Sequence, residues 1–238
     1  MILFKTNWNN LNIPVPYWTF YNENISVENG KLKISWKIDP TNPSHRPRVV
    51  LHDIPLDYYM RGKFVLPSEN HGWFVFFEPM AEDGTERLYF QLVLDSNYRL
   101  VAELKNVSTG EFIQSDVILQ TRPDAELDIK VHVKRDSVDG MLEVWVNGQK
   151  CWEFIGKTML YPDARCHAII LDCYKGMKQP LQTVYQDWFI YGTELVDMDV
   201  SPEPEPSGDS RFLYWSLLGA FGIVLIVLLA SSGMNKSD

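Results

Sequence analysis

Apolar and polar residues alternate along several stretches of the first 195 residues, with the period of two that marks a strand with one buried face. The clearest stretch is 127–134, where Leu, Ile and Val alternate with Asp, Lys and His. Similar alternation predicts strands at 32–36, 88–94 and 142–146, and the continuous apolar run 72–77 predicts a strand covered on both faces. Further predicted strands are 48–51, 62–66, 98–104, 117–120, 166–172 and 184–191.

Turn residues separate these strands. Asn147-Gly148 lies between two apolar stretches, and this dipeptide favours the type I′ turn of a hairpin because both central residues need positive φ. Asn29-Gly30, Asp83-Gly84 and Asp139-Gly140 predict further turns. No segment before residue 212 has a helical stripe. Many short strands without intervening helices predict an all-β, two-sheet antiparallel sandwich of the jelly-roll type.

The C-terminal part has a different composition. Residues 212–233 contain no charged side chain, and about 20 apolar residues span a bilayer as a helix. The preceding stretch alternates Pro and Glu, which favours an extended stalk. We therefore expect a β-sandwich over 1–198, a stalk over 199–211, a transmembrane helix over 212–233 and a tail over 234–238.

The N-terminus predicts how this protein reaches a membrane. Lys5, Asn7 and Asn9 interrupt the only apolar stretch there, so no signal peptide is expected. We expect a single-pass, C-terminally anchored membrane protein, with a virion membrane as one possible location. Arg211 and Lys236 flank the apolar segment equally and leave its orientation open.

Charge and motifs exclude several classes of function. A net charge of -9 and an isoelectric point of about 5.1 argue against nucleic-acid binding, which needs a basic surface. The three cysteines form no C-x-x-C pair, so no metal site is expected. Phosphate-binding glycine loops and calcium loops are also absent from the sequence, and we expect no cofactor.

Three segments together resemble a known fold. They are Val27-x-Asn-Gly-x-Leu32, the run 127–148 and the closing strand 184–192. Their order is similar to that of the concanavalin A-like jelly rolls, and within them to the heparin-lyase and alginate-lyase types of polysaccharide lyase. The resemblance implies a site on the concave sheet. Such folds host lectins, hydrolases, lyases and structural modules, so fold alone does not determine activity.

The lyase resemblance implies a site built from Tyr, His, Arg and an amide, in which Arg neutralises a uronate and Tyr or His moves protons. Arg87, Tyr89 and Gln91 alternate along one predicted strand. The stretch Cys173-Tyr174-Lys175-Gly176 matches the alginate-lyase Tyr-x-Lys-Ala-Gly-x-Tyr motif only in part, because the Ala and second Tyr are missing. The catalytic candidates are Arg87, Tyr89, His132, His167 and Tyr174. The ligand-binding candidates are Arg87, Tyr89, Gln91, Arg99 and Trp145.

Three functions are compatible with these features. The favoured hypothesis is a membrane-anchored, non-catalytic jelly-roll module that binds a glycan or a protein. A second is a structural minor capsid or envelope protein of a membrane-containing virus. A third is a polysaccharide lyase acting on uronate-containing glycans. A glycoside hydrolase is not expected, because the Glu-x-Asp-x-Glu pattern of paired carboxylates is missing.

Overall fold

The computed structural model describes residues 2–6, 18–21, 25–36, 48–70, 74–81, 88–106, 109–160, 166–173 and 182–194. The chain divides into two units, Met1–Pro202 and Glu203–Asp238, and all described residues belong to the first. The predicted stalk, transmembrane helix and tail lie outside the described residues. Within the described ranges, no helix has the length and apolar character needed to span a bilayer.

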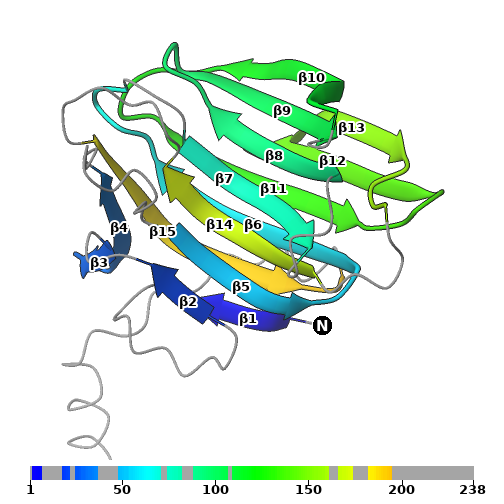
Figure 1. Cartoon of the computed structure of the whole chain (residues 1–238). Coiled ribbons are helices and arrows are strands. Elements are labelled where there is room, and N and C mark those ends of the chain that lie inside the picture. The colour runs from blue at the N-terminus through cyan, green and yellow to red at the C-terminus, as the bar shows by residue number, and fades with distance from the viewer. Residues whose placement is uncertain are drawn as a thin grey trace, which may run out of the picture. The chain divides into compact units, whose positions relative to one another are not determined.

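Every element of the described residues is a strand, and every strand pair is antiparallel (Figure 1). The first sheet has the order β13-β12-β11-β6-β15-β4-β3, and β1 pairs with β15. The second sheet has the order β10-β9-β8-β7-β14-β5-β2 and lies nearer the viewer in Figure 1. This arrangement confirms the predicted all-β, two-sheet antiparallel fold.

The strands of the first sheet are β1 (Ile2–Thr6), β3 (Ile25–Glu28), β4 (Lys31–Trp36), β6 (Asp57–Val65), β11 (Glu126–Lys134), β12 (Gly140–Val146), β13 (Gln149–Gly156) and β15 (Gln182–Gly192). The strands of the second sheet are β2 (Trp18–Tyr21), β5 (Arg48–Ile54), β7 (Phe74–Ala81), β8 (Leu88–Leu94), β9 (Arg99–Asn106), β10 (Glu111–Gln120) and β14 (Cys166–Cys173).

The hydrophobic core lies between the two sheets and is formed by the alternating apolar residues that the sequence pattern indicates. On β11, Ile129, Val131 and Val133 are fully buried. Phe64 from the first sheet meets Phe76 and Phe77 from the second, with edge-to-face ring centroids 4.8 and 5.9 Å apart. Burying such aromatic surfaces is the main stabilising contribution in a two-layer sandwich.

Strand β7 is buried on both of its faces, as its continuous apolar run predicts. Phe76 belongs to the main core, whereas Val75 packs with Val93 and Val101 in a separate cluster on the other side of the second sheet. All three valines are buried. The outer face of the second sheet is therefore shielded from solvent at this point.

Two of the predicted turns form where the sequence places them, whereas Asp83-Gly84 lies outside the described residues and Gly140 already belongs to β12. Asn147 and Gly148 have φ values of 52° and 81° and join β12 to β13. Asn29 and Gly30 have φ values of 52° and 72°. The segment from Val27 to Leu32 is accordingly a hairpin of β3 and β4.

Two strands begin five or six residues before their predicted starts. Strand β10 begins at Glu111 rather than Val117, because two β-bulges interrupt the alternation of its side chains and hide the period of two. Strand β6 begins at Asp57 rather than Gly62. Its first half alternates buried Tyr and Met with polar residues that form ion pairs and ring contacts.

Candidate functional site

The outer face of the second sheet carries a row of polar side chains that crosses three strands. Gln91 on β8 lies directly opposite Glu103 on β9, and Glu103 lies opposite Ser115 on β10. Phe90 and Leu92, on either side of Gln91, belong to the core, so Gln91 projects to the other side of the sheet. Despite this outward direction, Gln91 is only 8% exposed and Glu103 only 7% exposed.

Glu103 is chemically the most unusual residue in this row. Within the described part of the chain, no donor makes a hydrogen bond to its carboxylate, although the side chain is buried. Burial raises the pKa of Glu103, and the positive charge of Lys105 opposes that shift only in part. A buried carboxyl group with a raised pKa is a candidate for binding or proton transfer.

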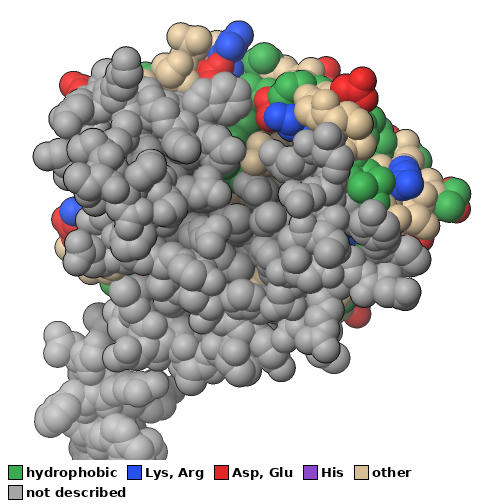
Figure 2. All heavy atoms as spheres, in the orientation of Figure 1, with side chains coloured by type: hydrophobic (Ala, Val, Ile, Leu, Met, Phe, Trp, Pro, Cys, Tyr) green, Lys and Arg blue, Asp and Glu red, His purple; other side chains and the backbone are tan. Residues whose placement is uncertain are grey.

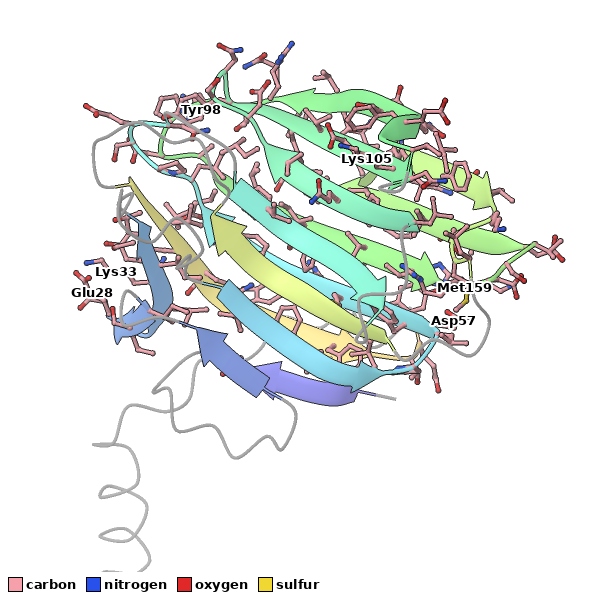
Figure 3. All side chains as sticks on the ribbon, viewed as in Figure 1. Glu28, Lys33, Asp57, Tyr98, Lys105 and Met159 are labelled. Carbon is pink, nitrogen blue, oxygen red and sulfur yellow. The ribbon has the colours of Figure 1, made fainter. Side chains whose placement is uncertain are left out.

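Lys105 lies two residues after Glu103 on the same strand. Its ammonium nitrogen is 4.9 Å from the ring centroid of Phe112 on β10. Lys105 lies on β9 in the sheet nearer the viewer (Figure 3). Figure 2 shows that hydrophobic, basic and acidic side chains mix on the described surface over β9 and β10. The row therefore combines an amide, a carboxyl group and a cation on two adjacent strands.

An apolar row runs parallel to the polar one. Val117, Val101, Val93 and Val75 are aligned by the strand register across β10, β9, β8 and β7. The last three are buried together, and Val117 is exposed at the edge of the sheet. The two rows make the outer face of the second sheet amphipathic.

Several predicted site residues belong to this sheet, but their side chains are outside the described part of the structure. Tyr89 on β8 lies opposite Lys105, so its backbone adjoins the polar row. His167 on β14 lies opposite Met80 on β7. Arg87 and Tyr174 lie wholly outside the described residues.

Arg99 has a structural environment and does not join Gln91. Its Nε donates to Asp95 Oδ2 at 2.7 Å, and its backbone N–H donates to Asp95 Oδ1 at 2.9 Å. Burial would raise the pKa of Asp95, but the bonds from Arg99 and Asn97 outweigh it and the pKa lies below its ordinary value. Arg99 thereby fixes the turn between β8 and β9.

His132 lies in the other sheet, so it does not converge with Gln91 or with the strand of His167. On β11, its Nδ1 is 2.8 Å from Glu143 Oε2 and its Nε2 is 2.8 Å from Asp57 Oδ1. Tyr59 stacks on the imidazole ring with centroids 4.0 Å apart. The ring can donate to both carboxylates at once only as imidazolium. Figure 3 shows Asp57 at the end of β6, away from Lys105.

Glu143 connects His132 to a lysine on the neighbouring strand. Lys150 donates to its Oε1 at 2.5 Å. Burial acts to raise the pKa of Glu143, but the bonds from Lys150 and His132 prevail and lower it. A buried imidazole held by two carboxylates and covered by a tyrosine ring has the character of a structural cluster.

Trp145 also lies on the outer face of the first sheet, as its polar neighbours predict. The ammonium nitrogens of Lys130 and Lys150 are 4.7 and 5.9 Å from its ring centroid. The aromatic ring of Trp145 therefore already makes cation–π contacts with two lysines of the same sheet. Trp145 and Gln91 lie on different sheets and form no common site.

Sequence reasoning did not identify Glu103. The feature that could have located Glu103 is the short connection between β8 and β9. In this connection, Tyr98 N–H donates to Asp95 O at 3.0 Å and closes a tight turn. A tight hairpin fixes the register, which places Glu103 beside Gln91. In the described ranges, no three His, Cys, Asp or Glu side chains are arranged to hold a metal ion.

Comparison with known proteins adds evidence at the level of structure. No family model and no curated protein matches the sequence. A glucuronan lyase from the fungus Trichoderma reesei superposes with a TM-score of 0.60, at 14% identity over 83% of this chain and 98% of the lyase. A non-specific endo-β-1,3(4)-glucanase of family GH16 gives 0.60, at 14% identity over 82% and 91% of the two chains.

An alginate lyase in complex with an alginate trisaccharide gives a TM-score of 0.56, at 11% identity over 80% of this chain and 98% of the lyase. The two-sheet antiparallel sandwich of this chain is thus similar to the concanavalin A-like jelly rolls of these proteins. Its structural neighbours include lyases and glucanases that degrade glycans. Identities this low show a shared architecture, so the chemistry rests on the residues of this chain.

Proposed function

We propose that this protein is a glycan-binding jelly-roll module whose ligand lies across the outer face of the second sheet. One observation carries the proposal: Glu103 is a largely buried carboxyl group beside Gln91 on the outward-facing side of the sheet. A sugar hydroxyl is a hydrogen-bond donor of suitable size for such a carboxyl group.

The surroundings of Glu103 match the two-sided chemistry of a sugar ring. Gln91 offers an amide that both donates and accepts, and Lys105 offers a cation. Val117, the exposed end of the neighbouring row of valines, provides an apolar surface for the C–H face of a pyranose. Ligand sites commonly combine apolar surface with a few fixed polar groups. The glycan-degrading neighbours support the same class of ligand.

Binding without catalysis is the form of this proposal that the described residues support. Glu103 is the single acidic residue in the sequences of β8 and β9, whereas glycoside hydrolysis uses a facing pair of carboxylates. His132, a candidate base for a lyase, lies on the other sheet. We further propose that residues 212–233 anchor the module in a membrane.

The test is calorimetric titration of the full-length protein in detergent with β-1,3-glucan, alginate and mucin-type oligosaccharides. Glu103→Gln and Gln91→Ala are expected to weaken binding about tenfold or more, because the first replaces a charge-assisted acceptor with a weaker neutral one and the second removes a hydrogen bond to the ligand. Glu111→Gln, at the exposed start of β10, is the matched control and should bind normally. Affinity that is absent across the panel, or unchanged in both variants, contradicts the proposal.

Turnover is measured in the same samples by reducing-end release and by ultraviolet absorbance of unsaturated uronates. We expect neither signal. Turnover that Glu103→Gln abolishes would convert the binding site into an active site and refute the non-catalytic part of the proposal.

A further inference from the structure

The strands that end the two sheets differ in how well they are protected against pairing with another chain. Strands β2 and β3 have four residues each, and β13 carries Lys150 and Glu153. Strand β10 has ten residues and contains neither Lys nor Pro. Short length, lysine, proline and β-bulges are the usual protections of an edge strand. Of these, strand β10 has only its two β-bulges.

Strand β10 also exposes apolar side chains. Phe112 is 52% exposed, Ile113 48% and Val117 53%. Hydrophobic side chains lie between charged ones at the top of the described surface, over β9 and β10 (Figure 2). Within the described ranges, β9 is the single strand that pairs with β10 in the sheet, and β13 of the other sheet contacts β10 without pairing with it. An exposed apolar edge of this kind favours the addition of another strand.

The centre of β10 is regular enough to pair. Two β-bulges flank the four residues Gln114–Val117, which pair without irregularity with β9. The one charge in this stretch, Asp116, is directed toward its own chain. Trp152 Nε1 and Gln114 Nε2 each donate to Asp116 Oδ2 at 2.7 Å. Asp116 therefore does not block the outer edge.

We propose that a second copy of this chain pairs antiparallel with β10 about a two-fold axis through Ser115. Opposite residues of an antiparallel pair share one face, which restricts the allowed registers. Centring the axis on Ser115 sets Asp116 opposite the partner's Gln114 and brings Val117 level with the partner's Ile113 at the first bulge. Centring it on Asp116 would set two carboxylates against each other. The register centred on Ser115 thus places an amide beside each carboxylate and an apolar residue beside each valine.

This interface would join the second sheets of two copies into one continuous sheet. Identical surfaces related by a two-fold axis give a closed dimer rather than a fibre. The paired stretch is short, so the dimer is expected to be of the weak class. Trapping by a cross-link is therefore the appropriate readout.

The test is disulfide trapping of the full-length protein in detergent. Ser115→Cys should form a covalent dimer under mild oxidation, because opposite residues have Cα atoms about 4.5–5.5 Å apart, within the range of a disulfide. Val117→Cys is the matched control: it is exposed on the same strand but lies away from the axis, so it should cross-link at least tenfold more slowly. The parent protein reports any background from its native cysteines.

A second variant tests the contact itself. Ile113→Lys with Val117→Lys, added to Ser115→Cys, should abolish the covalent dimer by placing charges at the edge, while circular dichroism stays that of a β protein. Equal trapping of Ser115→Cys and Val117→Cys overturns the proposal. Failure of Ser115→Cys to exceed the parent protein, or a dimer that survives the two lysines, overturns it as well.

Discussion

Gln186 offers the sharpest test of the energetics of the core. It lies on β15 opposite Phe64 of β6 and Leu32 of β4, and all three side chains are completely buried. Among the described residues, neither its Oε1 nor its Nε2 has a hydrogen-bond partner. Replacing Gln186 with Met keeps the length of the side chain and removes the amide.

The magnitude follows from the desolvation of that amide. Burying an uncompensated amide costs about 1–3 kcal/mol in protein mutational series. A volume-conserving swap to a flexible, unbranched side chain costs less than about 1.5 kcal/mol in repacking. Gln186→Met should therefore raise the free energy of unfolding by about 1–2 kcal/mol. For a domain of this size that gain corresponds to a rise in Tm of roughly 2–8 °C.

The assay is urea unfolding followed by tryptophan fluorescence, with the midpoint and the slope fitted separately. Gln149→Met, an exposed position at the start of β13, is the control and should change stability by no more than about 0.5 kcal/mol. A Gln186→Met protein that is no more stable than the parent would refute the reasoning, since it would mean that the amide is satisfied in solution.

Three further predictions concern other parts of the chain. His132→Ala should lower the free energy of unfolding by about 1–3 kcal/mol, because it removes the ring's hydrogen bonds to Asp57 and Glu143 and leaves Glu143 with Lys150 alone; thermal melting against a Lys134→Ala control checks this. Glu103→Gln should be more stable than the parent at pH 7 but as stable as the parent well below pH 4.5. Folding raises the pKa of Glu103 above its ordinary value of 4.5, so the parent loses stability as pH rises from there through the pKa of the folded state. A difference in Tm between the two proteins that is the same at pH 3 and at pH 7 would contradict this prediction. The full chain should resist alkaline carbonate extraction, whereas a chain ending at residue 202 should be released; release of both would refute a membrane anchor at 212–233.

The period of the sequence pattern was sufficient to predict most strands of the fold. Strand β11 alternates without interruption, and its apolar residues are the buried ones. The same method missed the first half of β10, because bulges place consecutive residues out of alternation and its outer edge is not buried. Alternation of apolar and polar residues arises because one face of a strand is buried. An exposed strand with bulges therefore shows little of this alternation.

The candidate site was harder to predict, because its chemistry depends on which strands are neighbours. His132 meets Asp57, which is 75 residues distant in sequence, and only the pairing of β11 with β6 brings them together. Grouping His132 with Gln91 failed because sequence order does not reveal the sheet to which a strand belongs. Glu103 is different, since a local hairpin sets its position beside Gln91.

The position of β15 has a consequence for the order in which this chain can fold. Although β15 is the last described strand in the sequence, it lies inside the first sheet, between β6 and β4. Until residues 182–192 have been synthesised, β6 and β4 remain separate edges on a nascent chain. Such distant pairings are slow to form and leave strands open to incorrect partners. The sheet therefore closes late in synthesis, and a chain truncated before β15 would lose a central strand rather than a dispensable edge.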